Sequence, residues 1–291
     1  MTRSSRLVTF TSLVALVTGL ATGCGHPSGP TDRWTIFNKW LYSVVTGPSQ
    51  TITIQANITN PYRKERLPLQ GADLHANALH PVAPVHIQTP VHIQTSESQV
   101  VFQYALLWSA RVAGTYRGDP IGVTVRLATG NRSFVLGKAY TRVVKHPVDW
   151  LALPYLSGGE AGQPDYLTGP HDFGFRFANH SDVPVRFMGL ETAGGFQFSR
   201  VGYVMNSKDV PGGYPKDARP LTSAGVVIPP HATCNVYAEF KQPSGYFNEL
   251  IQVAAVLEKD GVRGEEIVGP GMYTLNYSIM QILPRIIPRS T

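Results

Sequence analysis

The chain has 291 residues, of which 43% are hydrophobic and 15% are charged. This supply of apolar side chains is enough to fill a core, so an intrinsically disordered protein is excluded. The 28 glycines and 23 prolines favour many short strands joined by tight turns over a helical bundle. The formal net charge is +6, but Lys and Arg are scattered along the chain, so we expect no nucleic-acid partner.

The first residues follow the pattern of a secretory signal peptide. Arg3 and Arg6 give a positive start, an apolar stretch runs from Leu7 to Leu20, and three small residues follow at 21–23. The apolar stretch is too short to span a membrane comfortably. We therefore expect residues 1–23 to be a signal peptide and the protein to be exported.

Cys24 follows the small residues directly, and "LATGC" at 20–24 resembles the lipobox of bacterial lipoproteins, although Ala21 stands where that family usually has Leu. The resemblance implies that Cys24 is lipidated, with palmitate among its acyl chains. Two or more acyl chains give stable membrane anchoring. By resemblance to Gram-negative lipoproteins, Gly25 after the cysteine favours the outer membrane of the cell envelope. The alternative is an ordinary secretory signal in which Cys24 is incidental.

The mature chain is expected to begin with a lipidated cysteine and a Gly/Pro-rich tether at 24–33. The following segment, 34–45, is ambiguous. Trp34, Phe37 and Trp40 have helical spacing, whereas Trp40, Tyr42 and Val44 alternate as in a strand. We expect these aromatic side chains to lie in a core, and contact with lipid headgroups is the alternative.

Residues 34–146 are expected to form an N-terminal β-sandwich domain. In 51–59, Ile and Ala alternate with Thr, Gln and Asn, which is typical of a half-buried antiparallel strand. Similar runs occur at 100–108, 121–127 and 133–144.

A hexapeptide repeat, "PVHIQTPVHIQT", covers 84–95. Because six residues preserve the two-residue period of a strand, we expect both copies to keep the same face, with the side chains of Val and Ile opposite those of His and Gln. The prolines predict an edge strand or a long loop. The spacings of His75, His80, His86 and His92 match no compact zinc motif, so we expect surface histidines and no metal site.

A Pro- and Gly-rich stretch begins near Pro147, and we place a domain boundary there, with a second β-sandwich domain at 147–291. In this domain Phe173, Phe175 and Phe177 share one strand face, and Asp260-Gly261 marks a hairpin turn. The chain has two cysteines, and the second, Cys234, alternates with apolar residues. We expect Cys234 to be buried and inert.

Within the second domain, "FGFRFANHSDVPVRF", "VVIPPHATCNVYAEF" and "SGYFNELIQVAAV" resemble the Ig-like modules of the hydin-type and DUF1573 group. The resemblance covers less than a third of the chain and implies an Ig-like fold with a binding or scaffold role. DUF1573 proteins commonly have Cys-Gly-Cys where this chain has Ala-Gly-Gly at 193–195. Roles that depend on those cysteines therefore do not transfer.

The common hydrolase, phosphate-loop and dinucleotide motifs are missing, so we expect no enzyme and no cofactor. Asn179 to Asp182 places His beside Asp, but we interpret it as a hairpin tip. The paired acids Glu265 and Glu266 should point to opposite faces of a strand. The sequence thus favours a lipid-anchored envelope protein that binds or assembles a protein partner. The alternatives are a periplasmic chaperone-like protein and a carbohydrate-binding surface lipoprotein.

Overall fold

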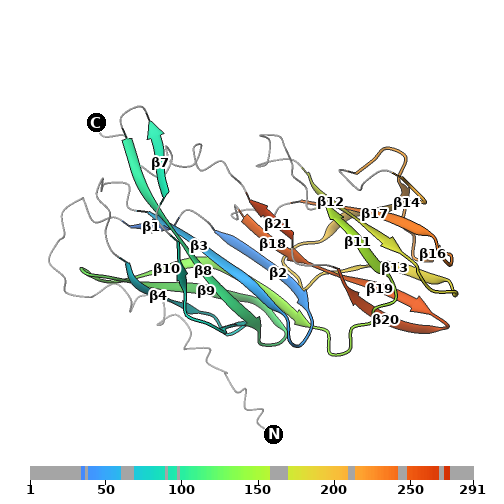
Figure 1. Ribbon diagram of the computed structural model, residues 1–291, viewed down its shortest axis with the longest axis horizontal. Helices are drawn as coiled ribbons and strands as arrows, with labels where there is room; N and C mark the ends of the chain where they lie inside the picture. Colours follow the sequence, from blue (N-terminus) through green and yellow to red (C-terminus); the bar gives the residue numbers. More distant parts are fainter. Residues whose placement is uncertain are drawn as a thin grey trace, which may run out of the picture.

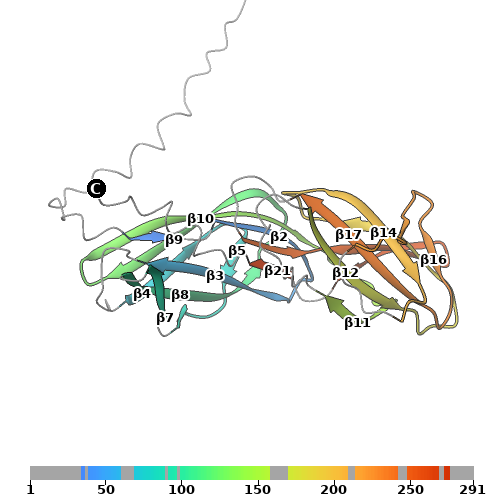
Figure 2. The same ribbon diagram turned by 90° about the horizontal axis from the view of Figure 1, so that it is seen from above.

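The computed structural model describes residues 34–36, 39–59, 69–88, 91–96, 99–157, 170–208, 214–241, 248–268 and 272–275. Within these ranges every regular element is a β-strand, so the predicted all-β fold is confirmed. The strands form four sheets. The sheets pack in pairs as two sandwiches, which lie end to end along the long axis of the molecule (Figures 1 and 2).

The first sandwich packs two sheets around one apolar core. One sheet contains, in spatial order, β1 (Thr35–Ile36), β3 (Thr51–Thr59) and β8 (Gln99–Val112), and three short strands pair with the other side of β8: β5 (Leu79–Pro81), β6 (His86–Ile87) and β7 (Val91–Ser96). The facing sheet has the order β21 (Met272–Leu275), β18 (Asn248–Gln252), β2 (Trp40–Thr46), β10 (Gly130–Val143), β9 (Tyr116–Leu127) and β4 (Leu69–His75).

Strand β3 shows why this part of the chain forms a sheet. Ile52, Ile54 and Ile58 point into the core, whereas Thr51 and Thr53 are exposed. β3 pairs antiparallel with β8 in continuous register. The predicted alternation at 51–59 is confirmed, and its period of two puts every large apolar side chain on the face that meets the second sheet.

The second sandwich is built from the remaining strands. One sheet has the order β11 (Ala152–Ser157), β12 (Pro170–Ala178), β17 (Thr233–Lys241), β14 (Phe198–Met205) and β15 (Arg219–Pro220). The other has the order β16 (Val226–Ile228), β13 (Val185–Glu191), β19 (Ala254–Lys259) and β20 (Val262–Ile267). Phe175, Phe177 and Phe187 are fully buried between these sheets, and the rings of Phe175 and Phe177 meet edge to face at 5.1 Å. Phe173 lies on β12, but its side chain is outside the described part.

The turn between β19 and β20 confirms the predicted hairpin. Asp260 and Gly261 have φ values of 52° and 75°. A two-residue turn with both central φ values positive has the twist that matches antiparallel strands, and Asp-Gly is a preferred pair for it. The short sequence signal was sufficient here because the turn is set by local backbone geometry.

The two sandwiches share a strand at their junction. β18 pairs parallel with β2 in the first sandwich, and after the single residue Val253 the chain continues as β19 in the second sandwich. β21 pairs with β18 in the same sheet. The sequence analysis assigned all of 147–291 to the second domain, yet β18 and β21 belong to a sheet of the first sandwich. Alternation predicts that a strand exists, but it does not predict the sheet that the strand joins.

Strand β2 is buried on both faces, which explains its ambiguous sequence. Trp40 and Tyr42 stack in the core of the first sandwich with ring centroids 5.4 Å apart. Leu41, on the opposite face, is 1% exposed and belongs to the core of the second sandwich. All seven residues of β2 are buried, so the strand lacks the polar alternation that marks a half-solvated strand.

Candidate functional site at the junction of the two sandwiches

The residue predicted to carry lipid, Cys24, lies outside the described residues, as does the whole predicted signal peptide and tether at 1–33. Cys234 lies on β17 and is 0% exposed. Burial raises the pKa of its thiol to about 12. The predicted burial of Cys234 is confirmed. That this cysteine is inert stays a prediction, supported by the raised pKa, because a thiol that does not ionise at neutral pH is a poor nucleophile.

The repeated hexapeptide forms an edge strand, as predicted, but the two copies do not keep the same face. β6 and β7 both pair with β8: His86 stands opposite Leu107, and His92 opposite Phe102. Positions five residues apart on one regular strand lie on opposite faces. The expectation that the duplication preserves parity is therefore wrong. The register against β8 shifts by one residue between β6 and β7, and residues 89 and 90, which connect the two strands, lie outside the described part of the chain.

The described histidines of this region are spread over both sheets. His75 ends β4, and its Nε2 lies 2.9 Å from Thr124 Oγ1 on β9. His80 and His86 lie on β5 and β6, in the facing sheet, and both are exposed. Among the described residues no group of three metal-ligating side chains is found.

Asn179 organises the turn after β12. The predicted turn is present, but the predicted hairpin is wrong, because β12 and the next strand, β13, lie in different sheets and do not pair. Its side-chain amide donates to the carbonyl oxygens of Val183, Ile228 and Pro229 at 2.9, 3.0 and 3.1 Å. Its oxygen accepts hydrogen bonds from the backbone N–H and the hydroxyl of Ser181. This is turn chemistry, in which one buried amide replaces backbone partners.

The junction between the sandwiches combines buried apolar contacts with a network of charged side chains, and we treat it as the candidate site. Leu41 on β2, Tyr140 on β10 and Ile251 on β18 contribute side chains to the core of the second sandwich. A smaller cluster joins Val45 and Val144 of the first sandwich to the second; its other members are Ala193, Ala254 and Ile267. Apolar burial at this position favours one fixed arrangement of the two sandwiches.

A glycine pair allows a loop of the second sandwich to approach β10 closely. Gly194 and Gly195 have φ values of 122° and 87°. A Cβ added to them would lie 2.8 and 2.9 Å from the ring of Tyr140. The carbonyl oxygen of Gly194 accepts a 2.6 Å hydrogen bond from the Ser43 hydroxyl on β2. The absence of side chains at these two positions is therefore required by the junction.

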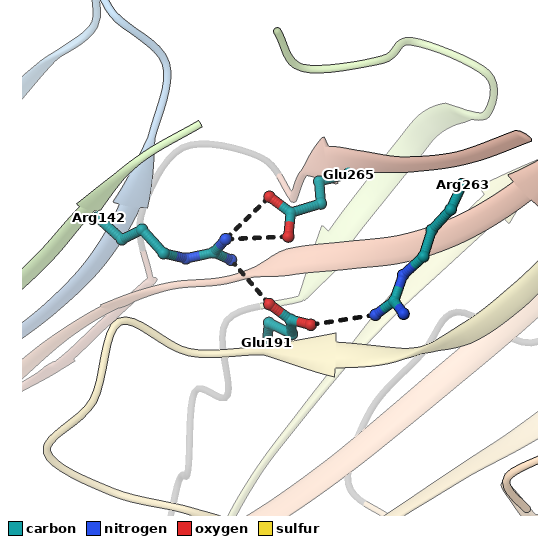
Figure 3. A network of polar contacts seen from close by, with 4 residues as sticks. All are labelled: Arg142, Glu191, Arg263 and Glu265. Carbon is teal, nitrogen blue, oxygen red and sulfur yellow. Dashed lines mark hydrogen bonds and ion pairs between the residues drawn. The ribbon is translucent and has the colours of Figure 1, made fainter. Parts of the chain in front are cut away.

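Four charged side chains form a network at the junction, in which Arg142 of the first sandwich meets residues of the second (Figure 3). Arg142 Nη1 on β10 lies 2.9 Å from both carboxylate oxygens of Glu265 on β20. Its Nη2 lies 3.3 Å from Glu191 Oε2 on β13, and Arg263 reaches the other oxygen of Glu191 at 3.4 Å. Two cations face two anions, so charge is balanced. Arg142 and Glu265 are partly buried, at 24% and 27% exposure, which reduces screening by solvent.

Glu266 points the other way from Glu265, as the alternation of a strand predicts. It is 4% exposed, and its Oε2 accepts backbone N–H groups from Trp150 and Leu151 at 2.9 and 3.0 Å. Burial raises the pKa of this carboxyl to about 7, against the lowering effect of these two hydrogen bonds, and Asp149 raises it further. Glu266 thus titrates near neutrality while it holds the segment that connects the sandwiches.

The sequence analysis did not select Arg142, Glu191 or the glycine pair as functional residues. One signal was present: Arg142 is a charged residue at the end of a strand, next to the predicted boundary near Pro147. A charged side chain at such a place can reach the next domain. Its two carboxylate partners lie 49 and 123 positions away along the chain, and no local pattern indicates that pairing.

The comparisons with known proteins add no name to this arrangement. No protein-family model matches the chain, and no curated protein matches it significantly. In the described residues, no helix has the length and apolar character needed to cross a bilayer.

Proposed function

We propose that this protein is a lipid-anchored protein of the bacterial cell envelope, in the outer membrane, that binds or assembles a protein partner and performs no catalysis. Lipid on Cys24 attaches it to the membrane, and the two joined sandwiches form its scaffold. The lipobox-like stretch at 20–24 supports the anchor. Ig-like modules of the kind resembled by the second domain are mostly scaffolding or envelope modules.

The observation that carries the scaffold role is the shared sheet at the junction. Two domains in one chain usually move relative to each other unless the contact between them is large and apolar. Here β2 is buried on both faces and β18 belongs to the first sandwich while its neighbour β19 belongs to the second. Such a body holds its surfaces at fixed positions, which is what a module needs when it positions a partner.

The anchor is tested by intact-mass analysis of protein extracted from its native membrane. We expect acylated Cys24 as the first residue, and release of the protein into the soluble fraction when Cys24→Ser is introduced. An unmodified Cys24, or a chain that retains residues 1–23, would contradict the anchor.

The partner is tested by photo-crosslinking in the intact envelope. Val135 on β10 and Val262 on β20 are 70% and 60% exposed, one on each sandwich, so a photoreactive residue at either place samples a different surface. We expect a discrete protein adduct from at least one of these or the other exposed positions. The matched control carries the photoreactive residue together with Cys24→Ser, and it should lose the adduct. A complete scan of exposed positions without any adduct would contradict the binding role.

A further inference from the structure

The segment between the sandwiches lies along the edge of β20 as an additional strand would. The backbone N–H of Val148 donates to the carbonyl oxygen of Glu265 at 2.8 Å. Gly264 leaves room for this contact, because a Cβ there would lie 2.7 Å from Val148 Cγ1 and 3.0 Å from Trp150 Cη2. An exposed sheet edge is a site for unwanted pairing, and the segment 148–151 covers this one.

A single carboxyl oxygen holds the end of this segment. Glu266 Oε2 accepts the N–H groups of both Trp150 and Leu151, and the Leu151 side chain, 1% exposed, enters the core of the second sandwich. The segment is therefore held by the packing of Leu151 in the core, by one main-chain bond to β20 and by one titratable side chain of β20. A change in the charge of that side chain acts directly on the attachment.

The charges around Glu266 do not compensate a negative charge on it. From the connecting segment, Asp149 faces it and adds repulsion. On β20 itself, Glu265 and Arg263 are directed to the other side, where they meet Arg142 of β10 and Glu191 of β13. Across the ladder on β19 its partner is the uncharged Ala255. Among the described residues, the groups that would stabilise an ionised Glu266 are thus two backbone N–H groups, and a buried charge with so little compensation is costly.

We propose that segment 148–151 is a pH-dependent latch, docked on β20 while Glu266 carries a proton and released increasingly as this carboxyl ionises. The direction follows from linkage. In the released form Glu266 is exposed to water and its pKa returns towards the ordinary value of 4.5, below the docked value of about 7, so the released form loses its proton first as pH rises. Docking is strongest below pH 4.5, the ordinary pKa of the carboxyl. It weakens as the pH rises to the docked pKa of about 7, and it changes little at higher pH. This inference does not depend on the membrane anchor or on the partner.

The test is hydrogen exchange of the full chain in detergent, followed by mass spectrometry of peptides that contain the amides of Trp150 and Leu151. Exchange is measured at about pH 5.5 and about pH 8.5 and corrected for the intrinsic rates. We expect the protection of these amides to fall at least about tenfold at the higher pH. Constant protection would overturn the proposal.

Three variants separate the latch from a general loss of stability. Glu266→Gln keeps an acceptor oxygen without the charge, and protection should become independent of pH. Asp149→Asn leaves the Glu266 carboxyl in place but removes the nearby repulsion, so the docked pKa falls, and the midpoint of the protection change should move to lower pH with a smaller total change. Glu265→Gln is the matched control on the other face and should keep the wild-type profile. The proposal would be contradicted if protection in Glu266→Gln still fell with rising pH. It would also be contradicted if the midpoint of the protection change in Asp149→Asn stayed at the wild-type pH, so one variant that folds poorly does not leave the proposal untested.

Discussion

At the level of single residues, the junction depends as much on missing side chains as on present ones. Gly194 and Gly195 let the backbone of the second sandwich rest against Tyr140, and Ser43 fixes the loop through the carbonyl oxygen of Gly194. A side chain at Gly195 would meet Tyr140 and Leu41 and obstruct this contact between the sandwiches.

Gly195→Ala tests this contact, with Gly261→Ala as its matched control. Both glycines have positive φ, 87° and 75°, but nothing lies within 4 Å of a Cβ at Gly261. The backbone strain of the substitution, about 1–2 kcal/mol, should be similar at both positions. Gly195→Ala should cost about 1–3 kcal/mol more, because the added methyl overpacks against Tyr140 and Leu41. Urea denaturation measures the free energy of unfolding of both variants. Equal losses of this free energy would show that the close contact at Gly195 does not contribute to stability.

At the level of elements, β18 connects two cores through adjacent residues. Leu250 belongs to the core of the first sandwich and Ile251 to that of the second, and each is 1% exposed. Successive side chains of a strand point to opposite faces, so a strand placed between two bodies contacts both. Strand β2 does the same with Tyr42 and Leu41.

Leu250→Ala and Ile251→Ala should therefore destabilise the same unit, although they lie in different cores. Each removes buried methyl groups and should cost about 2–5 kcal/mol. Because both residues lie on one strand, we expect both variants to lower the unfolding midpoint of probes in both sandwiches. The measurement is hydrogen exchange of β3 and of β12 under mild denaturant. Destabilisation confined to one sandwich in each variant would show that the cores unfold independently.

At the level of the whole molecule, the shared sheet makes two sandwiches into one body (Figure 1). Domains joined only by a linker unfold separately, whereas domains that share hydrogen-bonded strands lose ladder bonds in both when either opens. The charge network around Arg142 adds specific pairing to this apolar contact.

We expect a single heat-absorption peak when the full chain is heated in a calorimeter. The van't Hoff and calorimetric enthalpies should agree, which is the test of two-state unfolding. Arg142→Met removes the cation that joins Glu265 and Glu191 with little change in volume, and it should lower the midpoint while the single peak persists. Two resolved peaks in the unmodified protein would contradict the single unit.

Local geometry explains which parts of the fold could be predicted. The alternation at 51–59 and the Asp260-Gly261 turn depend on neighbouring residues, and both were found from the sequence. The parity of the hexapeptide repeat was predicted wrongly, because the face of each copy depends on its register against β8 rather than on the spacing within the repeat. The register of a strand against its neighbour can shift by one residue between two segments, and a sequence repeat does not predict such a shift.

The sequence alone determined the strand-forming character of this protein, the burial of Cys234 and the opposite orientations of Glu265 and Glu266. These follow from a period of two, which every stretch of strand obeys wherever it lies. Only the tertiary structure decided that β18 joins the first sandwich, that Arg142 meets Glu191 and Glu265, and that Glu266 holds the connecting segment. Such pairings join residues far apart in the chain, and their energies depend on burial and distance, which arise only when the sheets pack together.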